Sequence, residues 1–246
     1  MEQQGTKPVA AVIGGARRVG GVISLALARA GYDLAVSFKE SAAQAQRVRA
    51  EAEALGARTV CFAGDMSSRP AVQQFFAATL EAFGRVDLLV TNAGWFERTP
   101  IETLDEAQWE RLQRLNLWTT WLPAQCFGLH MREQGRGCIV AIADVAALRP
   151  WRQYLAYNVA KAGVVALVRT LARELAPAVR VNAVAPGPVL FPPDFAPEQR
   201  QREIERTLLK REGRPEHVAE AVLFLARNDY VTGVVLPVDG GRLYAG

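Results

Sequence analysis

Short runs of β-branched and apolar residues recur along the whole chain, and segments with helical periodicity separate them. The seven runs span residues 8–13, 33–38, 59–63, 86–90, 138–143, 179–185 and 234–238. Between them apolar residues follow helical spacing, as at Val164, Val168, Leu171 and Leu175. Strands that alternate with helices form a parallel sheet through right-handed crossovers, with helices on both faces. The sequence therefore predicts an α/β fold with a doubly wound, seven-stranded parallel sheet.

The same alternation bears on domain organisation, because 246 residues could form one large α/β domain or two small ones. No internal repeat, low-complexity tract or Gly/Ser linker interrupts it, so we expect a single Rossmann-type domain over residues 1–246. The irregular stretch is 186–199, where five prolines break both periodicities before a polar helix. Ligands of open α/β sheets bind beyond the carboxyl ends of the strands, and this stretch follows the sixth strand. We expect a substrate lid at residues 186–212.

Composition excludes several classes of protein. Half of the residues are hydrophobic, which is enough for a sizeable core, and the longest apolar strand-like run, 138–143, is far shorter than a membrane span. The first residues lack the apolar stretch of a signal peptide, so we expect a cytoplasmic protein without a membrane partner. The net charge is +4, but basic residues alternate with Glu along segments such as 200–214. Solvated helix faces explain this best, an anionic small ligand comes second, and nucleic acid is not expected.

The cysteines and histidines indicate neither a disulfide framework nor a metal site. Cys61, Cys126 and Cys138 lie far apart without a CxxC spacing, and His130 and His217 are isolated from each other.

Glycines cluster after the first strand, ahead of a helix expected to start near Val22. They stand at Gly14, Gly15, Gly20 and Gly21. Glycines at a strand-to-helix turn let the backbone approach a pyrophosphate, which the N–H groups and dipole of the helix N-terminus stabilise. A tight turn that needs positive φ would explain them as well.

Two other strand ends favour a nucleotide. Asp65 follows the third strand, where an adenine amino group could bind, and Asn92, Ala93 and Gly94 follow the fourth with small residues suited to a ribose. The glycine loop and these strand ends together predict a dinucleotide site.

The end of the second strand bears on the choice between NAD and NADP. A site specific for NAD has an acidic residue there to bind the ribose 2′-hydroxyl. This chain instead has Ser37 and Lys39, with Arg17 and Arg18 in the glycine loop. A hydroxyl group and cations suit a 2′-phosphate, so the sequence predicts NADPH. Glu40 leaves NADH open, since its carboxylate could reach the same ribose.

Tyr157 and Lys161 lie four residues apart in a helical segment, and Asp144 precedes the tyrosine by thirteen residues. Residues at i and i+4 share a helix face, so the phenol and the ammonium group can project into one pocket. An adjacent cation favours the phenolate, which predicts a lowered pKa for Tyr157 and proton transfer near neutral pH. The spacing alone also fits a surface pair.

The order of these motifs resembles the short-chain dehydrogenase/reductases over essentially the whole chain. The resemblance rests on the glycine loop, Asn92-Ala93-Gly94, Asn116, the YNVAK segment at 157–161, Pro186-Gly187 and the closing segment 231–241. It implies that Tyr157 donates a proton, that Lys161 lowers its pKa and binds the nicotinamide ribose, and that Asn116 helps to hold a relay water. Asn116 could equally be a buried polar residue at a helix kink.

The cofactor-binding residues predicted from the strand ends and the resemblance together are Gly14, Arg17, Arg18, Val19, Gly20, Ser37, Lys39, Asp65, Met66, Asn92, Ala93, Gly94, Tyr157, Lys161, Pro186 and Gly187.

Two departures from the common family pattern are similar to the pteridine reductases and the bacterial dihydromonapterin reductases. In a loop that usually reads TGxxxGxG, Ile13 replaces the threonine and Arg18 the middle glycine; Asp144 stands where a catalytic serine normally lies. Phe96 follows shortly after the Asn-Ala-Gly tripeptide. The resemblance implies reduction of a pterin ring by NADPH, usually in a homotetramer, with Arg18, Phe96, Asp144 and Tyr157 at the substrate.

Asp144 has a physical basis for this chemistry. An ionised carboxylate only accepts hydrogen bonds, whereas a ketone oxygen needs a donor such as serine. A pterin ring presents N–H donors and imine nitrogens that gain protons, so a carboxylate beside Tyr157 suits it. Asp144 could instead cap a helix. Phe96 would stack the heterocycle against the nicotinamide, or fill the core at a strand end.

Further aromatic residues could line this pocket or a subunit contact: Trp95, Trp151, Phe191 and Phe195. The segments 109–129 and 157–175 also carry more apolar positions than one sheet face needs, which favours a closed symmetric assembly.

Two other functions stay open at this point. A carbonyl or 3-oxoacyl-thioester reductase on the same scaffold is expected if Asp144 points away from the pocket. A regulator that binds NADPH without catalysis is the third possibility, and the intact Asn116, Tyr157 and Lys161 argue against it.

Overall fold

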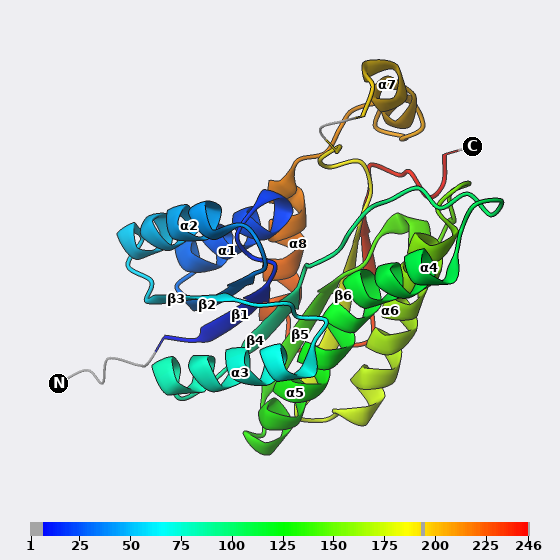
Figure 1. Cartoon of the computed structure of the whole chain (residues 1–246). Helices are drawn as coiled ribbons and strands as arrows, with labels where there is room; N and C mark the ends of the chain where they lie inside the picture. The colour runs from blue at the N-terminus through cyan, green and yellow to red at the C-terminus, as the bar shows by residue number, and fades with distance from the viewer. Residues whose placement is uncertain (1–6, 193–194, 246) are drawn as a thin grey trace.

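The computed structural model describes residues 7–192 and 195–245 and forms one seven-stranded sheet (Figure 1). Its strand order is β3-β2-β1-β4-β5-β6-β7, and every neighbouring pair is parallel. This confirms the predicted doubly wound α/β fold. Residues 1–6, 193–194 and 246, which belong to the predicted domain and lid, lie outside the described residues.

The strands start and end within two residues of the predicted runs. They are β1 (Val9–Ile13), β2 (Asp33–Phe38), β3 (Thr59–Ala63), β4 (Leu88–Thr91), β5 (Gly137–Ile142), β6 (Val179–Pro186) and β7 (Val235–Val238). The helices are α1 (Arg18–Arg29), α2 (Ala42–Ala54), α3 (Arg69–Phe83), α4 (Glu106–Gln113), α5 (Thr119–Glu133), α6 (Leu155–Glu174), α7 (Pro197–Glu205) and α8 (Pro215–Arg227).

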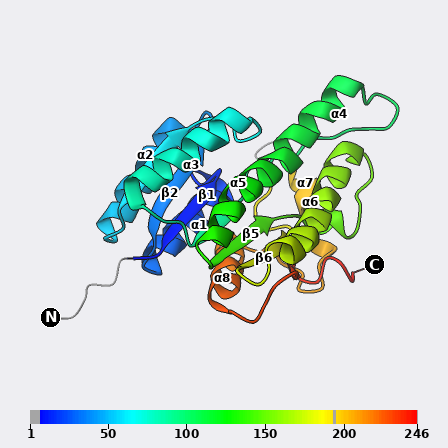
Figure 2. The ribbon, with the colours of Figure 1, turned by 90° about the horizontal axis from the view of Figure 1, so that it is seen from below.

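Two hydrophobic clusters, one on each face of the sheet, form the core. Successive residues of β1 point to opposite faces: Ala10 and Val12 pack with α1, α2 and α8, whereas Ala11 and Ile13 pack with α3, α5 and α6. Figure 2 shows these helices on either side of the sheet. Both faces of the central strands are buried, which explains why their sequences are continuous apolar runs and do not alternate with polar residues.

Helix α1 begins at Arg18, four residues before the predicted start at Val22. Gly20 and Gly21 therefore lie in its first turn. A Cβ on Gly20 would collide with the Gly14 carbonyl oxygen and lie 2.5 Å from Asn92 Nδ2. Sequence reasoning took these glycines for loop residues because glycine disfavours helix, whereas close contact between the helix, the loop and β4 requires them here.

The helical segment after β4 is interrupted by a π-helical turn, η1 (Arg114–Trp118), which joins α4 to α5. Asn116 lies in this turn and is fully buried. Asn116 is therefore a buried polar residue in an irregular turn between two helices, and π-helical turns often occur at functional sites.

Among the described helices, α6 is long and apolar enough to cross a membrane. Half of its apolar stretch is buried inside the protein. Val164 and Val168 belong to the core cluster on their face of the sheet. A core helix of a globular domain passes the same test.

Helix α7 stands apart from the sheet, beyond the carboxyl ends of the strands (Figure 1). None of its residues is buried. The lid predicted for residues 186–212 coincides with this helix and the segments around it, and its movement stays a prediction.

Candidate functional site

A cleft of about 1750 Å³ opens where the parallel strands end. Residues that follow β1, β2, β4, β5 and β6 line it, as expected for an open α/β sheet. The cleft is lined by every residue of the predicted cofactor, catalytic and substrate sets except Gly20, which lies behind the glycine loop. The fold thus brings the predicted site residues together.

The glycine loop fits a dinucleotide. Gly14 has φ +68°, and a Cβ there would lie 3.0 Å from the backbone of Ala93. Asn92 Nδ2 donates to the Gly14 carbonyl oxygen at 3.1 Å, which ties the loop to the end of β4. Because α1 starts directly after this turn and its first residues line the cleft, the positive end of the helix dipole faces the site. These features provide the close backbone approach that a pyrophosphate requires.

Arg18 occupies the left-handed region with φ +52°, so its backbone takes the conformation in which related loops have glycine. Its Nη2 donates to the carbonyl oxygens of Leu190 and Phe191 at 3.0 and 3.2 Å. Burial and the charge of Arg17 lower the pKa of Arg18. Through its hydrogen bonds to Leu190 and Phe191, the Arg18 guanidinium group joins the glycine loop to the segment after β6. Sequence reasoning did not predict this contact between distant residues.

The direction of the Ser37 hydroxyl group differs from the one expected for a ligand of a 2′-phosphate. Its side chain is buried, and its Oγ accepts from Gly14 N at 3.3 Å, so it supports the glycine loop from below. It was expected as a ligand of a 2′-phosphate because sequence alone could not show which way the hydroxyl group points. The exposed cations that remain at this end of the cleft are Arg17 and Lys39.

Lys39 binds Asp65 through Nζ and Oδ2 at 2.8 Å, and this hydrogen bond raises the pKa of Lys39. Asp65 also accepts from the backbone N and the Oγ of Ser67 at 2.9 and 2.7 Å. Although burial opposes its charge, these bonds hold the pKa of Asp65 below its usual value. Binding of adenine by Asp65 stays a prediction. The exposed side chains of Arg17 and Glu40 have no hydrogen bond or ion pair with any described residue.

Tyr157, Asp144 and Lys161 lie together in the cleft between β5 and α6. Tyr157 Oη donates to Asp144 Oδ2 at 2.7 Å, and Asp144 Oδ1 accepts from Ala146 N at 2.7 Å. Lys161 Nζ donates to the carbonyl oxygen of Ile142 at 3.0 Å. Asp144 therefore caps the 3₁₀ turn η2 (Val145–Ala147), as one of the two alternatives predicted. It does not point away from the pocket, the position on which the sequence-based expectation of a carbonyl reductase depended, and its contact with a substrate stays a prediction.

The electrostatics of Tyr157 differ from the prediction. Burial, followed by the charge and hydrogen bond of Asp144, raises the pKa of Tyr157 well above its usual value. Lys161 does not reverse this, because its ammonium group binds the Ile142 carbonyl and lies 5.9 Å from the centre of the Tyr157 ring. The expected lowering of the tyrosine pKa is therefore wrong for this state of the protein. The structure instead keeps the phenol protonated.

The two partners of the tyrosine are shifted by burial in opposite directions. Burial raises the pKa of Asp144 against the opposing effects of Ala146 N, Tyr157 and Lys161. Burial lowers the pKa of Lys161, and the charge of Asp144 opposes it. Both shifts have the same origin, since burial in this part of the cleft disfavours the charged form of each group.

Asn116 uses its amide to fix the loop after β4. Its Oδ1 accepts from Trp95 N at 2.9 Å, and its Nδ2 donates to the carbonyl oxygens of Trp95 and Leu112 at 3.0 and 3.1 Å. The side chain thus shapes the cleft wall beside Gly94. A role in holding a relay water stays a prediction.

Aromatic side chains form the wall opposite the glycine loop. Phe96 stacks on Tyr154 with ring centres 4.5 Å apart, and meets Tyr157 and Trp151 edge-on at 5.0 and 5.6 Å. One face of Phe96 is therefore occupied by Tyr154, which sequence reasoning missed although it lies one helical turn before Tyr157. The four aromatic residues that sequence left between pocket and subunit contact all line the cleft: Trp95, Trp151, Phe191 and Phe195.

Two carboxylates that the sequence did not single out organise the walls. Glu97 accepts from Trp95 Nε1 at 2.9 Å, and its two carboxylate oxygens accept from Arg111 Nη2 at 2.7 and 2.9 Å. Glu203 of α7 accepts from Arg242 Nη2 at 3.0 Å, which links the helix to the C-terminal segment. No sequence signal could have found them, since isolated acids are common on helices and loops. Among the described residues no group of three or more His, Cys, Asp or Glu side chains could hold a metal ion.

Comparison with known proteins places this cleft in a broad group of oxidoreductases. Residues 14–242 match the family described as enoyl-(acyl carrier protein) reductase. The chain is 34% identical to a 3-oxoacyl-(acyl-carrier-protein) reductase of Synechocystis over 97% of this chain and 98% of the relative. It is 35% identical to an L-rhamnose 1-dehydrogenase (NAD(P)(+)) of Sphingomonas over 94% of each. The crystal structure of levodione reductase superposes with a TM-score of 0.91 at 28% identity, covering 98% and 99% of the two chains.

The contact between Asp144 and Tyr157 leads to a prediction about ionisation. Because the carboxylate charge contributes to the raised pKa of Tyr157, we expect Asp144→Asn to lower that pKa, so that the phenolate appears at lower pH. Ultraviolet titration of the phenolate measures this, with the Tyr157→Phe protein subtracted to isolate one tyrosine. Glu97→Gln removes a carboxylate of the same cleft without contact to Tyr157 and should leave the onset in place. An unchanged onset in Asp144→Asn would contradict the assignment.

Proposed function

The chain belongs to the short-chain dehydrogenase/reductase superfamily, and from this premise we propose that it is an NADPH-dependent reductase of carbonyl groups, of ketones or 3-oxoacyl thioesters. The observation that carries the proposal is the Tyr157 hydroxyl group, which donates to Asp144 Oδ2 at 2.7 Å in the cleft at the carboxyl ends of the strands. Relatives named for a 3-oxoacyl group and for L-rhamnose support it.

The residues of the chain can carry out the proton transfer of such a reaction. A nicotinamide cofactor bound in the cleft would supply a hydride to the carbonyl carbon, and the carbonyl oxygen would then need a proton. Tyr157 donates it, because its raised pKa keeps the phenol protonated until negative charge develops on that oxygen. Burial raises the pKa of Asp144, and in its protonated form the carboxyl group would donate a hydrogen bond to the carbonyl oxygen as a serine hydroxyl does.

Lys161 and the loop after β4 hold the cofactor side of the site. Lys161 uses one N–H on the Ile142 carbonyl, which leaves two donors for a ribose. Gly94 lies beside it, since a Cβ there would be 3.4 Å from Lys161 Nζ and 3.0 Å from Asn116 Oδ1. Any larger residue would fill the space over the ammonium group.

Reduction of a pterin C=N bond is the second candidate, and Asp144 is the observation that favours it. In its ionised form the carboxylate accepts from N–H groups of an aminopyrimidine ring while Tyr157 protonates the ring nitrogen. Phe96 offers an aromatic surface in the same cleft, although Tyr154 covers one of its faces. The two candidates differ in the protonation state that Asp144 needs.

An NADPH-oxidation assay distinguishes them. We expect the protein to turn over ketones or oxoacyl thioesters, and Asp144→Ser to keep or raise this activity because serine supplies a neutral donor. Pterin reduction would instead fall by about tenfold or more in Asp144→Ser, through loss of the charged acceptor. Tyr157→Phe serves as the common control and should lower either activity by roughly 10²-fold or more. Dihydropterin turnover without ketone turnover would reject the carbonyl proposal in favour of the second candidate.

The preference for NADPH is a further part of this proposal. Arg17 of the glycine loop and Lys39 after β2 line this end of the cleft with Glu40 and Asp65. Lys39 already pairs with Asp65, so among the described residues Arg17 offers the unpaired positive charge to a 2′-phosphate. NADPH should bind at least tenfold more tightly than NADH, a difference of about 1.4 kcal/mol. Equilibrium titration measures both affinities, and Arg17→Gln should reduce the difference. Arg47→Gln, on the exposed side of α2 away from the cleft, is the matched control. Equal affinities in the unmodified protein would assign the ribose to Glu40.

We also propose a homotetramer. The edge strand β7 is only half buried, and Phe224 on α8 is 50% exposed. Val159 on α6 and Leu129 on α5 are likewise exposed, so both a sheet edge and a helical face present apolar surface. Light scattering at micromolar concentration should give four times the mass of the chain. A monomer under these conditions would exclude the assembly.

A further inference from the structure

The positive charge of this protein is concentrated in the cleft. Among the described residues, eleven Lys and Arg but only five Asp and Glu line it. The rest of the described chain holds 18 of each kind, so it is neutral in sum. A cleft that contains the whole charge excess of the described chain attracts anions.

The acids of the cleft do not neutralise this excess, because most of them already have a cation. Glu97 pairs with Arg111 at 2.7 Å, and Glu203 pairs with both Arg206 at 2.7 Å and Arg242 at 3.0 Å. Four further arginines of the cleft have no acidic partner among the described residues: Arg98, Arg149, Arg152 and Arg202.

Two of these four are available to a ligand. Arg149 donates to carbonyl oxygens of the C-terminal segment, at 3.3 Å for Arg242 and Leu243, and Arg98 binds the Gln153 side chain. The side chains of Arg152 and Arg202 are exposed and have no hydrogen bond or ion pair with any described residue. Arg152 lies in the loop before α6, three residues from the start of that helix, and Arg202 lies on α7.

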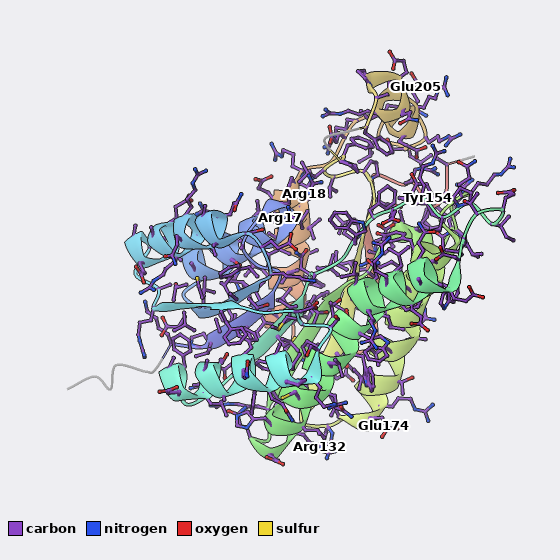
Figure 3. All side chains as sticks on the ribbon, in the orientation of Figure 1. Arg17, Arg18, Arg132, Tyr154, Glu174 and Glu205 are labelled. Atoms are coloured by element: carbon purple, nitrogen blue, oxygen red, sulfur yellow. The ribbon has the colours of Figure 1, made fainter. Side chains whose placement is uncertain are left out.

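Both arginines belong to the substrate end of the cleft. In Figure 3, Tyr154, which follows Arg152 by two residues, and Glu205 at the end of α7 both lie to the right of Arg17 and Arg18, which begin α1. The cofactor end has its own cations, Arg17 and Lys39, for a phosphate. A cofactor phosphate therefore does not account for Arg152 and Arg202.

Aromatic rings line the same cleft as these arginines and Tyr157. Phe96, Trp151 and Tyr154 pack against Tyr157 on one wall, and Phe191 and Phe195 stack on each other with ring centres 5.4 Å apart. An apolar wall beyond a proton donor suits an apolar body, and guanidinium groups at its outer end suit an oxyanion, which they bind with paired N–H donors.

We propose that the substrate is a carbonyl compound that carries an oxyanion remote from the carbonyl, and that Arg152 and Arg202 bind this anionic group. The proposal rests on the proposed carbonyl reduction and extends it to the substrate class. The oxyanion is a carboxylate of a small substrate or a phosphate of a thioester carrier, which present the same chemistry to guanidinium groups.

Matched anionic and neutral substrates test it. One pair is 4-acetylbenzoate with 4-acetylbenzamide, and the other is acetoacetyl-coenzyme A with its neutral N-acetylcysteamine analogue. We expect kcat/KM of NADPH oxidation to be at least about tenfold higher for the anionic member of one pair, which corresponds to roughly 1.4 kcal/mol. The Arg152→Gln/Arg202→Gln variant should bring that ratio close to one. Arg29→Gln/Arg47→Gln, an equal charge change on exposed residues outside the cleft, should preserve it.

A preference in the first pair assigns a carboxylate of a small substrate, and a preference confined to the second assigns the carrier phosphate. Reduction of both members of each pair at equal efficiency would overturn the inference and leave carbonyl reduction intact. A ratio that survives in the Arg152/Arg202 variant would overturn it as well.

A binding measurement separates the inference from the proposed function. Trp95 and Trp151 line the cleft, so their fluorescence reports titration with 4-acetylbenzoate, 4-acetylbenzamide or coenzyme A without any turnover. Binding of an anion that depends on Arg152 and Arg202 and weakens with salt supports the inference even if no ketone is reduced. Binding of the carboxylate no tighter than that of the amide, with no arginine-dependent binding of coenzyme A, overturns it.

Discussion

Parallel pairing of all seven strands is the constraint on which the site depends. Because every strand runs in the same direction, all carboxyl ends meet at one edge, and residues separated by more than 100 positions share a cleft there. The pairing also buries both faces of the central strands, which makes the edge rigid. Gly14 after β1, Asn92 after β4 and Ala143 after β5 are consequently held in place by the sheet itself.

At this edge the chemistry of one carboxylate sets the character of the site. Asp144 follows β5, caps a short turn through Oδ1 and accepts from Tyr157 through Oδ2, so one carboxylate holds both the turn and the tyrosine. Burial raises its pKa and that of the tyrosine together. Both shifts favour the protonated groups. Under the proposed function the substrate decides which form of Asp144 is used, the neutral acid for a carbonyl group or the carboxylate for a pterin ring.

The walls of the cleft depend on arginines that act in different ways. Arg18 connects the glycine loop to the segment after β6, Arg149 holds the C-terminal segment, and Arg242 joins that segment to α7. These contacts use guanidinium groups as structural donors to backbone oxygens and to Glu203. Arg152 and Arg202 lack such partners among the described residues, which is why charge at the outer end of the cleft is available to a ligand.

The sequence by itself determined the number of strands and their positions along the chain, the alternation of strands with helices, the glycine loop and the Tyr157–Lys161 pair. These features follow from local periodicity and fixed spacing. Only the tertiary structure decided the start of α1, since the close contact of Gly20 with Gly14 overrides its low helix propensity. It also turned Ser37 inward and Arg18 toward Leu190, and it raised the pKa of Tyr157 where spacing predicted the opposite. Hydrogen-bond partners and burial come from residues far apart in the chain, and no local pattern encodes them.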